Sequence, residues 1–487
     1  MPTPLSSSDT LIQALHAIVG QAHVLQPDAV DGLDRHLHDW RGRYQGRALA
    51  VVRPGNTDEV ARIVQACAAR SVAIVPQGGN TSLVGGSVPD DSGTQIVLHL
   101  GRLQQVRGVD AANLSITVDA GCTLAQVQQA ADDAGLLFPL SLASEGSCTI
   151  GGNLASNAGG TQVLRYGTAR ELCLGLEAVT AQGEIWHGLQ GLRKDNSGYD
   201  LRDLLIGSEG TLGIITAATL KLYPRPKGQA CALVACPDAA AAVSLLQQAR
   251  LQLDAGLTAF EAMAPLPLRL VRRHHPAAAA AVGEAAWQAV EQASAWLVLI
   301  EHVSIESPDH AEHRLHTVLS EALAQGLITE ASLASNLAQQ QALWRLRETI
   351  PLAEKAEGLM VKHDIGVPSS AIPAFVHETA QAIAAQWDDA RIVCFGHLGD
   401  GNLHYNVQPP AALSQGPALA TFEAAVNQIV FDQVQRFGGT LSAEHGIGAL
   451  RCGELARRKS PVALSMMRAI KLALDPQGIL NPGRVLG

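Results

Sequence analysis

The stretch P-Q-G-G-N-T-S-L-V-G-G occupies residues 76–86, at the end of a short apolar run, 72–76, that predicts a buried strand. Its glycines allow the backbone to turn sharply and to approach a ligand, and successive N–H groups in such a loop can bind phosphate oxygens. A second stretch, E-G-S-C-T-I-G-G-N-L-A-S-N-A-G-G, occupies residues 145–160 and consists mainly of small residues. Two loops of this kind predict that the chain binds a nucleotide cofactor, and tight surface turns are the alternative.

Neither loop has the pattern of the two common nucleotide-binding motifs. No G-x-G-x-x-G opens a helix within a βαβ unit, and no G-K-[ST] is present, which excludes a Rossmann fingerprint and a P-loop. The sequence therefore predicts a nucleotide that is held by loops of another kind.

Length and composition predict a globular enzyme of two or three domains. The chain has 487 residues, of which 47% are hydrophobic and 16% charged. The net charge of −10 argues against nucleic acid as a partner, because nucleic-acid binding needs basic surfaces. No apolar run is long enough to cross a bilayer, and residues 1–10 lack the regions of a secretion signal. The eight cysteines form no C-x-x-C pair, so we expect reduced thiols and a cytoplasmic protein.

Apolar patterns predict strands and helices on both sides of a proline-rich break. The segment Y-P-R-P-K-G, residues 223–228, predicts a domain boundary because proline interrupts helices and central strands. We expect Thr57 to cap a helix with Val60, Ile63, Val64 and Cys67 on its buried face. Further strands are expected at 48–54, 95–100, 115–118, 214–222, 295–303 and 391–395, and helices at 123–134, 238–251 and 284–293.

Four motifs together resemble the PCMH-type FAD domain of the vanillyl-alcohol oxidase superfamily. They are the two glycine loops, D-N-S-G-Y-D-L at residues 195–201 and I-G-S-E-G-T-L-G-I-I-T at residues 206–216. Within the superfamily, the chain is similar to the D-lactate and D-2-hydroxyglutarate dehydrogenase branch from about Ala48 to the last residue.

The resemblance implies an α+β fold with three parts. These are a PCMH-type FAD-binding domain of two subdomains at 1–224 (core 47–224), an antiparallel-sheet and helix substrate (cap) domain with the metal site at 225–450, and a C-terminal helical segment at 451–487 that returns to the flavin.

The resemblance also implies how FAD is bound. Many relatives attach FAD through a loop histidine, but this chain has Asn80-Thr81-Ser82 there, so we expect the FAD to be non-covalent. The residues expected to contact FAD are Pro76, Gln77, Gly78, Gly79, Asn80, Thr81, Ser82, Gly85, Pro139, Gly146, Ser147, Thr149, Gly151, Gly152, Asn153, Ser156, Asn157, Gly160, Ile215 (near the adenine) and Asn481.

A second set of motifs is rich in histidine. G-H-L-G-D-G-N-L-H-Y-N, residues 396–406, places His397 and His404 around a Gly-Asp-Gly turn, and a hairpin there would direct both imidazoles to one place. S-A-E-H-G-I-G, residues 442–448, adds Glu444. Two histidines and a carboxylate form a three-ligand set with open positions, as in catalytic Zn²⁺ or Mn²⁺ sites, and unrelated loop histidines are the alternative. We expect Cys394 to be a buried structural residue rather than a ligand.

The resemblance extends to the metal and substrate residues. His397, His404 and Glu444 match the metal ligands of the D-2-hydroxyglutarate branch, and the substrate-binding groups match Arg347, Lys362, Asn406 and His445.

Arg347 and Lys362 match cations that hold a substrate carboxylate in 2-hydroxyglutarate-type enzymes. Relatives of the D-lactate type usually lack the lysine. Pro351 departs from the family pattern, because close relatives carry a substrate-binding threonine there. His363 either lines the pocket or is structural.

These features predict FAD- and metal-dependent oxidation of a D-2-hydroxy acid, such as D-2-hydroxyglutarate or D-malate, to the 2-oxo acid. We expect the metal to bind the C1 carboxylate and the hydroxyl, His445 to remove the hydroxyl proton, and the hydride to pass from C2 to flavin N5. Electrons then pass to a separate acceptor, such as an electron-transfer flavoprotein or a quinone, and we expect a homodimer. The alternatives are a D-lactate- or glycolate-type monocarboxylate dehydrogenase, a metal hydrolase and a non-catalytic flavin-binding protein.

Overall fold

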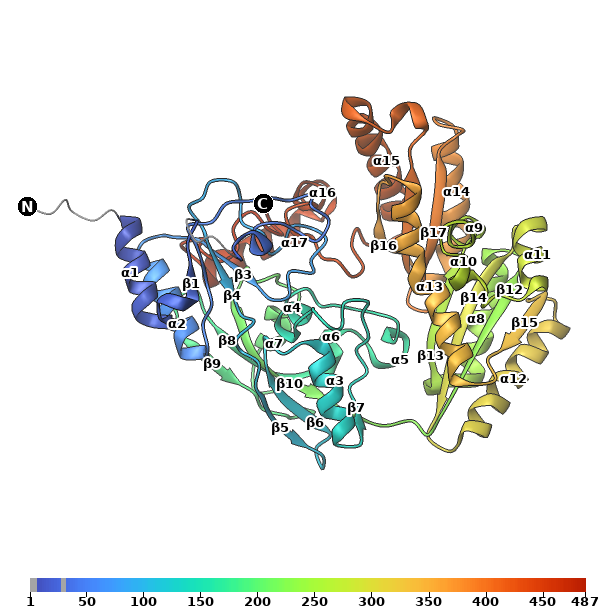
Figure 1. Cartoon of the computed structure of the whole chain (residues 1–487), viewed down its shortest axis with the longest axis horizontal. Helices are drawn as coiled ribbons and strands as arrows, with labels where there is room; N and C mark the ends of the chain where they lie inside the picture. Colours follow the sequence, from blue (N-terminus) through green and yellow to red (C-terminus); the bar gives the residue numbers. More distant parts are fainter. Residues whose placement is uncertain (1–6, 28–31) are drawn as a thin grey trace, which may run out of the picture. The chain divides into compact units, whose positions relative to one another are not determined.

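A computed structural model describes residues 7–27 and 32–487 of the chain (Figure 1). Its internal contacts divide the chain into two compact units. Unit 1 contains residues 1–159, 167–224 and 444–487, and unit 2 contains residues 160–166 and 225–443. The main part of unit 2 is therefore an insertion between two segments of unit 1.

The first sheet of unit 1 has four strands in the order β1-β2-β4-β3. β2 and β3 each run parallel to β4, whereas β1 pairs with β2 antiparallel. Two helices share an apolar core with this sheet, and the predicted buried face of the second helix is confirmed. The elements are α1 (Ser7–Val19), β1 (Val24–Leu25), β2 (Ala50–Val52), α2 (Thr57–Ala68), β3 (Ile74–Gln77) and β4 (Ile96–His99).

The predicted cap of α2 is wrong by one residue. Asn56 precedes the helix, and its side-chain oxygen accepts a hydrogen bond from the backbone N–H of Glu59 at 2.9 Å. Thr57 is the first helical residue, and its hydroxyl donates to Glu177 Oε1 at 2.7 Å. Asparagine is at least as good a cap as threonine, and the Thr57 hydroxyl bonds the neighbouring sheet instead.

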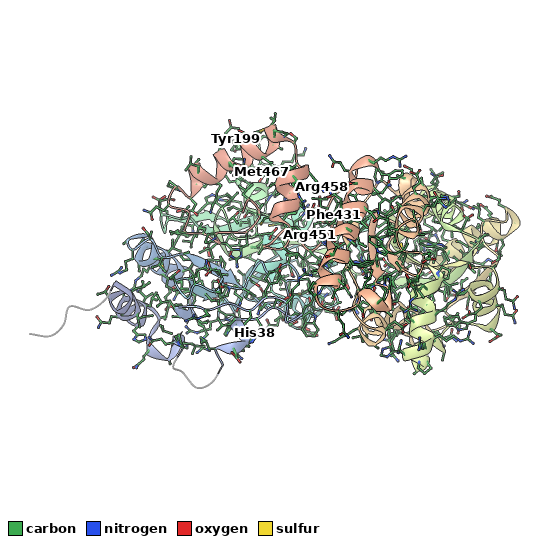
Figure 2. All side chains as sticks on the ribbon, turned by 90° about the horizontal axis from the view of Figure 1, so that it is seen from above. His38, Tyr199, Phe431, Arg451, Arg458 and Met467 are labelled. Carbon is green, nitrogen blue, oxygen red and sulfur yellow. The ribbon has the colours of Figure 1, made fainter. Side chains whose placement is uncertain are left out.

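The second sheet of unit 1 is antiparallel and has five strands in the order β5-β6-β10-β8-β9. Its strands are β5 (Val106–Asp110), β6 (Ser115–Asp119), β8 (Cys173–Val179), β9 (Ile185–Gly188) and β10 (Ile214–Lys221). The associated short elements are α3 (Leu124–Asp133), β7 (Leu136–Leu137), α4 (Ile150–Ala155), α6 (Ala169–Leu172), α7 (Leu201–Leu205) and β11 (Tyr223–Pro224). Tyr199, in the third FAD motif, is 97% exposed (Figure 2).

The last segment of unit 1 returns to the first sheet. After α16 (Cys452–Arg458) and α17 (Pro461–Leu474), Leu480 forms a parallel bridge with Ile74 at the edge strand β3. The Ile74 N–H donates to the Ile479 carbonyl at 2.7 Å, and the Asn481 N–H donates to the Ile74 carbonyl at 2.8 Å. Residues from the two ends of the sequence therefore complete one sheet edge.

Unit 2 is built on a seven-stranded antiparallel sheet with the order β15-β12-β14-β13-β17-β18-β16. The strands are β12 (Gly228–Cys236), β13 (Leu257–Met263), β14 (Trp296–Ser304), β15 (Glu330–Leu333), β16 (Asp364–Gly366), β17 (Arg391–His397) and β18 (Asn402–Gln408).

Helices cover both faces of this sheet and form two separate apolar cores. One face packs against α8 (Ala239–Leu253), α12 (Pro308–Ala324), α14 (Ile372–Ala384) and α15 (Gly416–Arg436). The other packs against α9 (Pro265–His274), α10 (Pro276–Ala279), α11 (Glu284–Gln292) and α13 (Leu337–Glu357). The segment α5 (Val163–Tyr166) contacts β13. In the part of the chain that the structure describes, none of the helices has the length and apolar character needed to span a membrane.

A buried polar network links α2 to the five-stranded sheet. Glu177 on β8 accepts hydrogen bonds from Arg107 at 2.9 Å, from Thr57 at 2.7 Å and from Thr216 at 3.1 Å. Burial alone would raise the pKa of Glu177, but these donors lower it from 4.5 to about 2. The ionised carboxylate therefore stabilises unit 1.

This network predicts how the stability of the protein depends on pH. Because the folded-state pKa of Glu177 lies below its ordinary value, its contribution is fully present above about pH 4.5 and is lost as the pH falls toward about 2. In urea denaturation, Glu177→Gln should be less stable than the wild type near neutral pH. The difference between the two, about 1–3 kcal/mol, should shrink as the pH falls to about 3. A difference that stays constant with pH would contradict this role.

Candidate functional site

The two glycine loops contact each other in unit 1. A Cβ atom added to Gly78 would lie 2.2 Å from Thr149 Oγ1, and one added to Gly79 would lie 1.9 Å from the Ser147 carbonyl oxygen. Such distances leave no room for a side chain, so only glycine allows the first loop to lie against the second. The loops predicted to bind a nucleotide therefore lie together.

Two of the predicted cofactor residues carry buried polar atoms without a hydrogen-bond partner within residues 7–27 and 32–487, namely Thr149 Oγ1 and Asn481 Oδ1. The Asn481 amide nitrogen donates to the carbonyl oxygens of Gly86 and Glu209 at 2.9 and 2.8 Å, which fixes the orientation of the amide. Because buried polar atoms are seldom left unpaired in native proteins, both atoms fit a polar ligand such as FAD.

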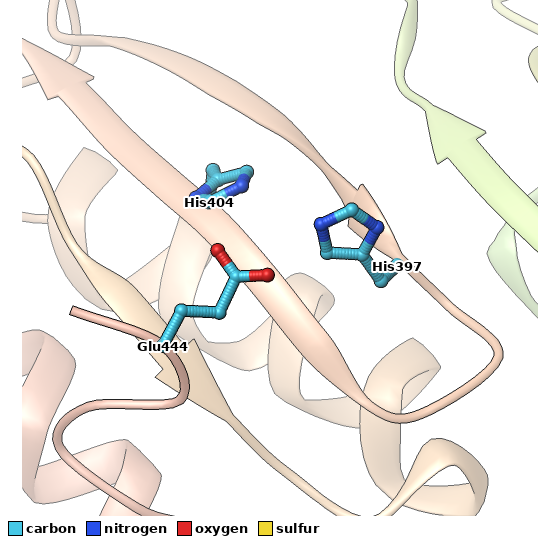
Figure 3. Close-up of side chains that lie close together, drawn as sticks. All are labelled: His397, His404 and Glu444. Carbon is cyan, nitrogen blue, oxygen red and sulfur yellow. The ribbon is translucent and has the colours of Figure 1, made fainter. Parts of the chain in front are cut away.

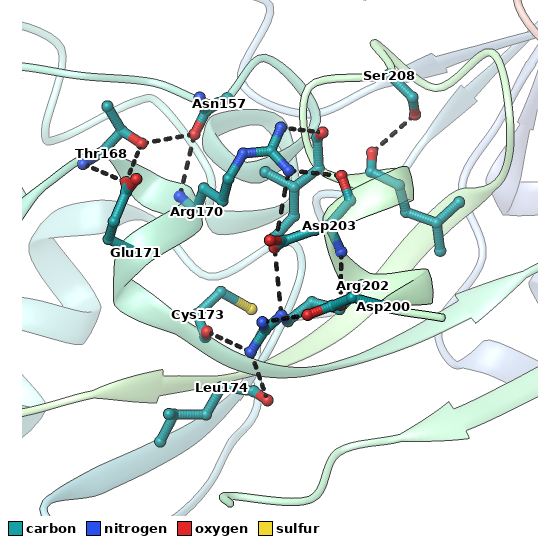
Figure 4. A network of polar contacts seen from close by, with 12 residues as sticks. Asn157, Thr168, Arg170, Glu171, Cys173, Leu174, Asp200, Arg202, Asp203 and Ser208 are labelled. Atoms are coloured by element: carbon teal, nitrogen blue, oxygen red, sulfur yellow. Dashed lines mark hydrogen bonds and ion pairs between the residues drawn. The ribbon is translucent and has the colours of Figure 1, made fainter. Parts of the chain in front are cut away.

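Other predicted cofactor side chains bind the protein itself. Gln77 Oε1 lies 2.6 Å from His36 Nδ1, and the Asn80 amide donates to the His38 carbonyl at 2.8 Å. Asn157 Oδ1 accepts hydrogen bonds from the Thr168 hydroxyl at 2.8 Å and from a backbone N–H at 3.0 Å (Figure 4). These three side chains hold the loops in shape, so at these three positions contacts with a cofactor would come from the backbone.

The remaining predicted cofactor residues lie in the same loops, in the adjoining sheet or, for Pro139, just after β7. Ile215 is 5% exposed within β10, and Gly160 is the first residue of the short segment that belongs to unit 2. The others belong to unit 1: Pro76, Thr81, Ser82, Gly85, Pro139, Gly146, Ser147, Gly151, Gly152, Asn153 and Ser156. Their contacts with FAD stay predictions.

The histidine motif of residues 396–406 folds into a β-hairpin, as predicted. β17 and β18 pair with His397 opposite Asn402 and Phe395 opposite His404. Because alternate residues of a strand share a face, His397, Phe395 and His404 lie on one face of the sheet. The two imidazole ring centroids are 5.9 Å apart.

Glu444 completes a group of three potential metal ligands. One ligand atom each from His397, His404 and Glu444 lies within 4.8 Å of the others, and the carboxylate points toward the two imidazoles (Figure 3). Glu444 directly follows Ala443, the last residue of unit 2, whose N–H donates to the Asp364 carbonyl oxygen at 3.3 Å. Two nitrogens and a carboxylate suit Zn²⁺ or Mn²⁺ and leave coordination positions for a substrate.

Glu261 on β13 fixes one of these imidazoles. Its Oε1 lies 2.5 Å from His397 Nδ1, so a neutral imidazole that donates its Nδ1–H to Glu261 would offer Nε2 to a metal. Its Oε2 accepts a hydrogen bond from Arg347 Nε at 2.9 Å. Burial alone would raise the pKa of Glu261, but His397 and Arg347 lower it to about 2, so the carboxylate is ionised.

Arg347 is linked to His397 through Glu261 and to His404 through Phe395. Its guanidinium also stacks over the Phe395 ring at 4.7 Å, and that ring lies 4.9 Å from the His404 ring. Only 8% of the Arg347 side chain is exposed, which holds the cation in a fixed position beside the group of three ligands.

A second possible ligand group shares Glu444 with the first. Potential ligand atoms of Asp364, Glu444 and His445 lie within 4.8 Å of one another. Asp364 is opposite His404 in the sheet, and its Oδ1 accepts a hydrogen bond from Asn402 Nδ2 at 2.9 Å. The residue predicted to be the base, His445, is therefore close to two carboxylates.

The other two predicted substrate residues meet at a buried carboxylate. Glu354 on α13 accepts hydrogen bonds from Lys362 Nζ at 2.9 Å and from Asn406 Nδ2 at 2.6 Å. Lys362 and Asn406 are cross-strand neighbours, because Val361 and Val407 form a bridge on one side and the Tyr405 N–H donates to the His363 carbonyl on the other.

Two residues, His363 and Cys394, point to the opposite face of the sheet and so lie outside the site. His363 is 1% exposed, with Nδ1 2.8 Å from the Tyr405 carbonyl oxygen and Nε2 2.9 Å from Asn427 Oδ1, so its role is structural. Cys394 belongs to the apolar core that this face forms with α8, α12, α14 and α15. Burial raises the pKa of its thiol to about 12. It is a buried structural cysteine, as predicted.

Glu261, Glu354 and Asp364 were not predicted from the sequence. A single acidic residue inside the apolar strand T-A-F-E-A-M, residues 258–263, is a signal that could have identified Glu261, because an unpaired buried carboxylate is costly. Glu354 lies in a helix with several charged residues, where one carboxylate does not differ in pattern from the rest.

Family comparisons match both halves of the chain. Residues 48–188 match the family described as "FAD binding domain", and residues 225–485 match the family described as "FAD linked oxidases, C-terminal domain".

Curated proteins are similar over nearly the whole chain. D-2-hydroxyglutarate dehydrogenase of Xanthomonas citri pv. viticola is 38% identical over 453 residues, which cover 93% of this chain and 92% of the relative. That of Stutzerimonas stutzeri is 34% identical and covers 98% of both chains. The mitochondrial enzyme of Arabidopsis thaliana is 35% identical over 96% of this chain and 80% of its own length.

Solved structures share the fold. Alkyldihydroxyacetonephosphate synthase has a TM-score of 0.75 at 19% identity and covers 97% of this chain and 84% of its own. p-Cresol methylhydroxylase has a TM-score of 0.75 at 15% identity, covering 100% of this chain and 98% of its own. The predicted α+β fold of the PCMH type is therefore confirmed.

The contacts of Glu261 predict a large loss of stability in Glu261→Gln. Glutamine cannot accept hydrogen bonds from both Arg347 and His397, and it leaves a buried guanidinium without a counter-charge, so unfolding should become easier by about 3–5 kcal/mol.

A matched control is Glu357→Gln, on α13. Glu357 is bonded by Arg273, His274 and Arg391, whose side chains are 68%, 22% and 42% exposed, so its partners stay hydrated when it is lost and the cost should be smaller, about 1–2 kcal/mol. Equal losses for the two variants in urea denaturation would show that the Glu261 contacts carry no special weight.

Proposed function

The chain belongs to the FAD-linked oxidases, and we propose that this FAD-dependent oxidoreductase converts a D-2-hydroxy acid into the corresponding 2-oxo acid. The substrate proposed is D-2-hydroxyglutarate or a similar dicarboxylate such as D-malate. The observation that carries the proposal is the gathering of His397, His404 and Glu444 beside a fixed arginine in a chain with FAD-binding loops. Relatives named D-2-hydroxyglutarate dehydrogenase support this substrate class.

Two bound groups are part of the proposal. When bound, FAD supplies the acceptor for the hydride that leaves C2, and a divalent metal held by His397, His404 and Glu444 supplies a Lewis acid for the hydroxyl and the adjacent carboxylate. Zn²⁺ and Mn²⁺ both suit this set of donors.

The side chains divide the remaining work. His445 removes the hydroxyl proton, because an imidazole is basic near neutral pH and this one follows ligand Glu444 directly. Arg347 orients a substrate carboxylate, since its Nε is already bonded to Glu261 and its position is fixed. Loss of one proton to His445 and of one hydride from C2 converts the alcohol into the ketone.

The distal end of the substrate would face Lys362 and Asn406. A lysine at this position favours a second carboxylate, whereas Pro351 removes the hydroxyl that close relatives offer. A specific observation favours the alternative, a monocarboxylate substrate of the D-lactate or glycolate type, because Glu354 already balances the charge of Lys362.

Three further features belong to the proposal. The electrons leave to a separate acceptor, such as an electron-transfer flavoprotein or a quinone. The protein acts as a homodimer in the cytoplasm.

Anaerobic mixing with a panel of 2-hydroxy acids tests the function. D-2-hydroxyglutarate or D-malate should bleach the flavin absorbance, and their L-enantiomers should not. Prior chelation should abolish bleaching, and added Zn²⁺ or Mn²⁺ should restore it. An FAD-loaded, metal-loaded protein that no 2-hydroxy acid bleaches would point instead to a non-catalytic flavoprotein.

A variant of the proposed base tests the mechanism. His445→Ala should keep its FAD and metal content but reduce flavin about a hundredfold more slowly, because the variant lacks the imidazole that accepts the hydroxyl proton. The rate of bleaching in stopped flow measures this. Near-normal reduction at all pH values would remove His445 as the base.

A further inference from the structure

Glu354 is a buried carboxylate that lies beside the predicted substrate residues. Its side chain is 1% exposed, while that of Lys362 is 31% exposed. Glu354 is separated from Arg347 and Pro351 by seven and three positions along α13, spacings that place all three residues on one face of the helix. The helix that supplies Arg347 therefore also places a negative charge beside the distal cation.

The contacts of Glu354 occupy both of its oxygens. Oε2 accepts a hydrogen bond from Lys362 Nζ at 2.9 Å, and Oε1 accepts one from Asn406 Nδ2 at 2.6 Å. Asn406 Oδ1 in turn accepts the backbone N–H of His363 at 3.1 Å. The amide of Asn406 is thus held from both ends in one orientation.

This arrangement determines what Lys362 and Asn406 can offer a ligand. An ammonium group has three N–H donors, and one is used by Glu354. The Asn406 amide uses its oxygen and one N–H within the protein, which leaves one N–H. Both residues therefore offer hydrogen-bond donors, so the distal end of a substrate has to be an acceptor.

The charge of Lys362 is balanced before any ligand arrives. A substrate carboxylate that approaches the ammonium also approaches the Glu354 carboxylate, and its attraction to one is opposed by its repulsion from the other. A carbonyl or hydroxyl oxygen meets much less repulsion.

We propose that Glu354 is a specificity-determining residue that lowers the preference of this site for a second carboxylate and admits D-2-hydroxy acids whose distal acceptor is uncharged. This rests on the proposed function, in which Lys362 and Asn406 contact the distal end of the substrate. Glu354 acts through these two residues and does not itself touch the substrate.

Glu354→Gln removes the negative charge with little change in size. The readout is the ratio of kcat/KM for D-2-hydroxyglutarate to that for its C5 amide, in which an uncharged amide with a carbonyl acceptor replaces the distal carboxylate. The ratio should rise about tenfold in Glu354→Gln, because Lys362 is no longer neutralised. Glu357→Gln, one turn further along α13 and bonded to Arg391, should leave the ratio unchanged. An unchanged or lower ratio in Glu354→Gln overturns the proposal.

A double variant separates a charge effect from a local loss of structure. In a Lys362→Met background, Glu354→Gln should no longer raise the ratio, because the cation through which it acts is absent. A rise that persists without Lys362 would overturn the assignment.

Binding of unreactive acids to the resting holoenzyme tests the role of Glu354 without turnover. By calorimetry, the preference for glutarate over its monoamide, glutaramate, should increase about tenfold in Glu354→Gln. A protein that oxidises no 2-hydroxy acid but shows this shift would refute the proposed function and support the role of Glu354. Bleaching by 2-hydroxy acids with no shift in binding would support the proposed function and refute the role of Glu354. A failure of both acids to bind either protein would also refute the role of Glu354.

Discussion

The candidate site depends on the carboxylate of Glu261, in the middle of the seven-stranded sheet. One oxygen faces the imidazole of His397 on the next strand, and the other faces the guanidinium of Arg347 on the covering helix. A buried charge is tolerated only when it is paired and hydrogen-bonded, so the three groups need one another. A single carboxylate thus fixes the tautomer of a potential metal ligand and the direction of the cation proposed to orient the substrate.

Strand alternation keeps the polar groups apart from the apolar packing. On β18, His404 and Asn406 face the site, whereas Tyr405 between them belongs to the core on the other side. Cys394 and His363 are likewise turned toward that core. A shift of one residue in the pairing of β17 with β18 would exchange the two sets, so the hairpin turn determines whether the site exists.

Features that depend on neighbouring residues were predictable from the sequence, and features that depend on distant residues were not. The hairpin around His397 and His404 follows from a Gly-Asp-Gly turn within one motif, and the glycine loops follow from their composition. The partner of His397 is 136 positions away along the chain, and the partner of Asn406 is 52 positions away. No local pattern indicates which distant carboxylate a strand will meet. The motif resemblance correctly identified the family, but it did not reveal that Gln77 and Asn80 use their side chains to hold the loops.

The bridge between Leu480 and Ile74 has a consequence for biosynthesis. A ribosome makes the first strands of unit 1 early, but the segment that completes their edge emerges only after all of unit 2 has been translated. Until then β3 has a free edge and the Asn481 amide is missing from its place beside Gly86. The inserted unit can fold while the surrounding one waits, so the flavin-binding half should be the last to mature and the part most dependent on chaperones during synthesis.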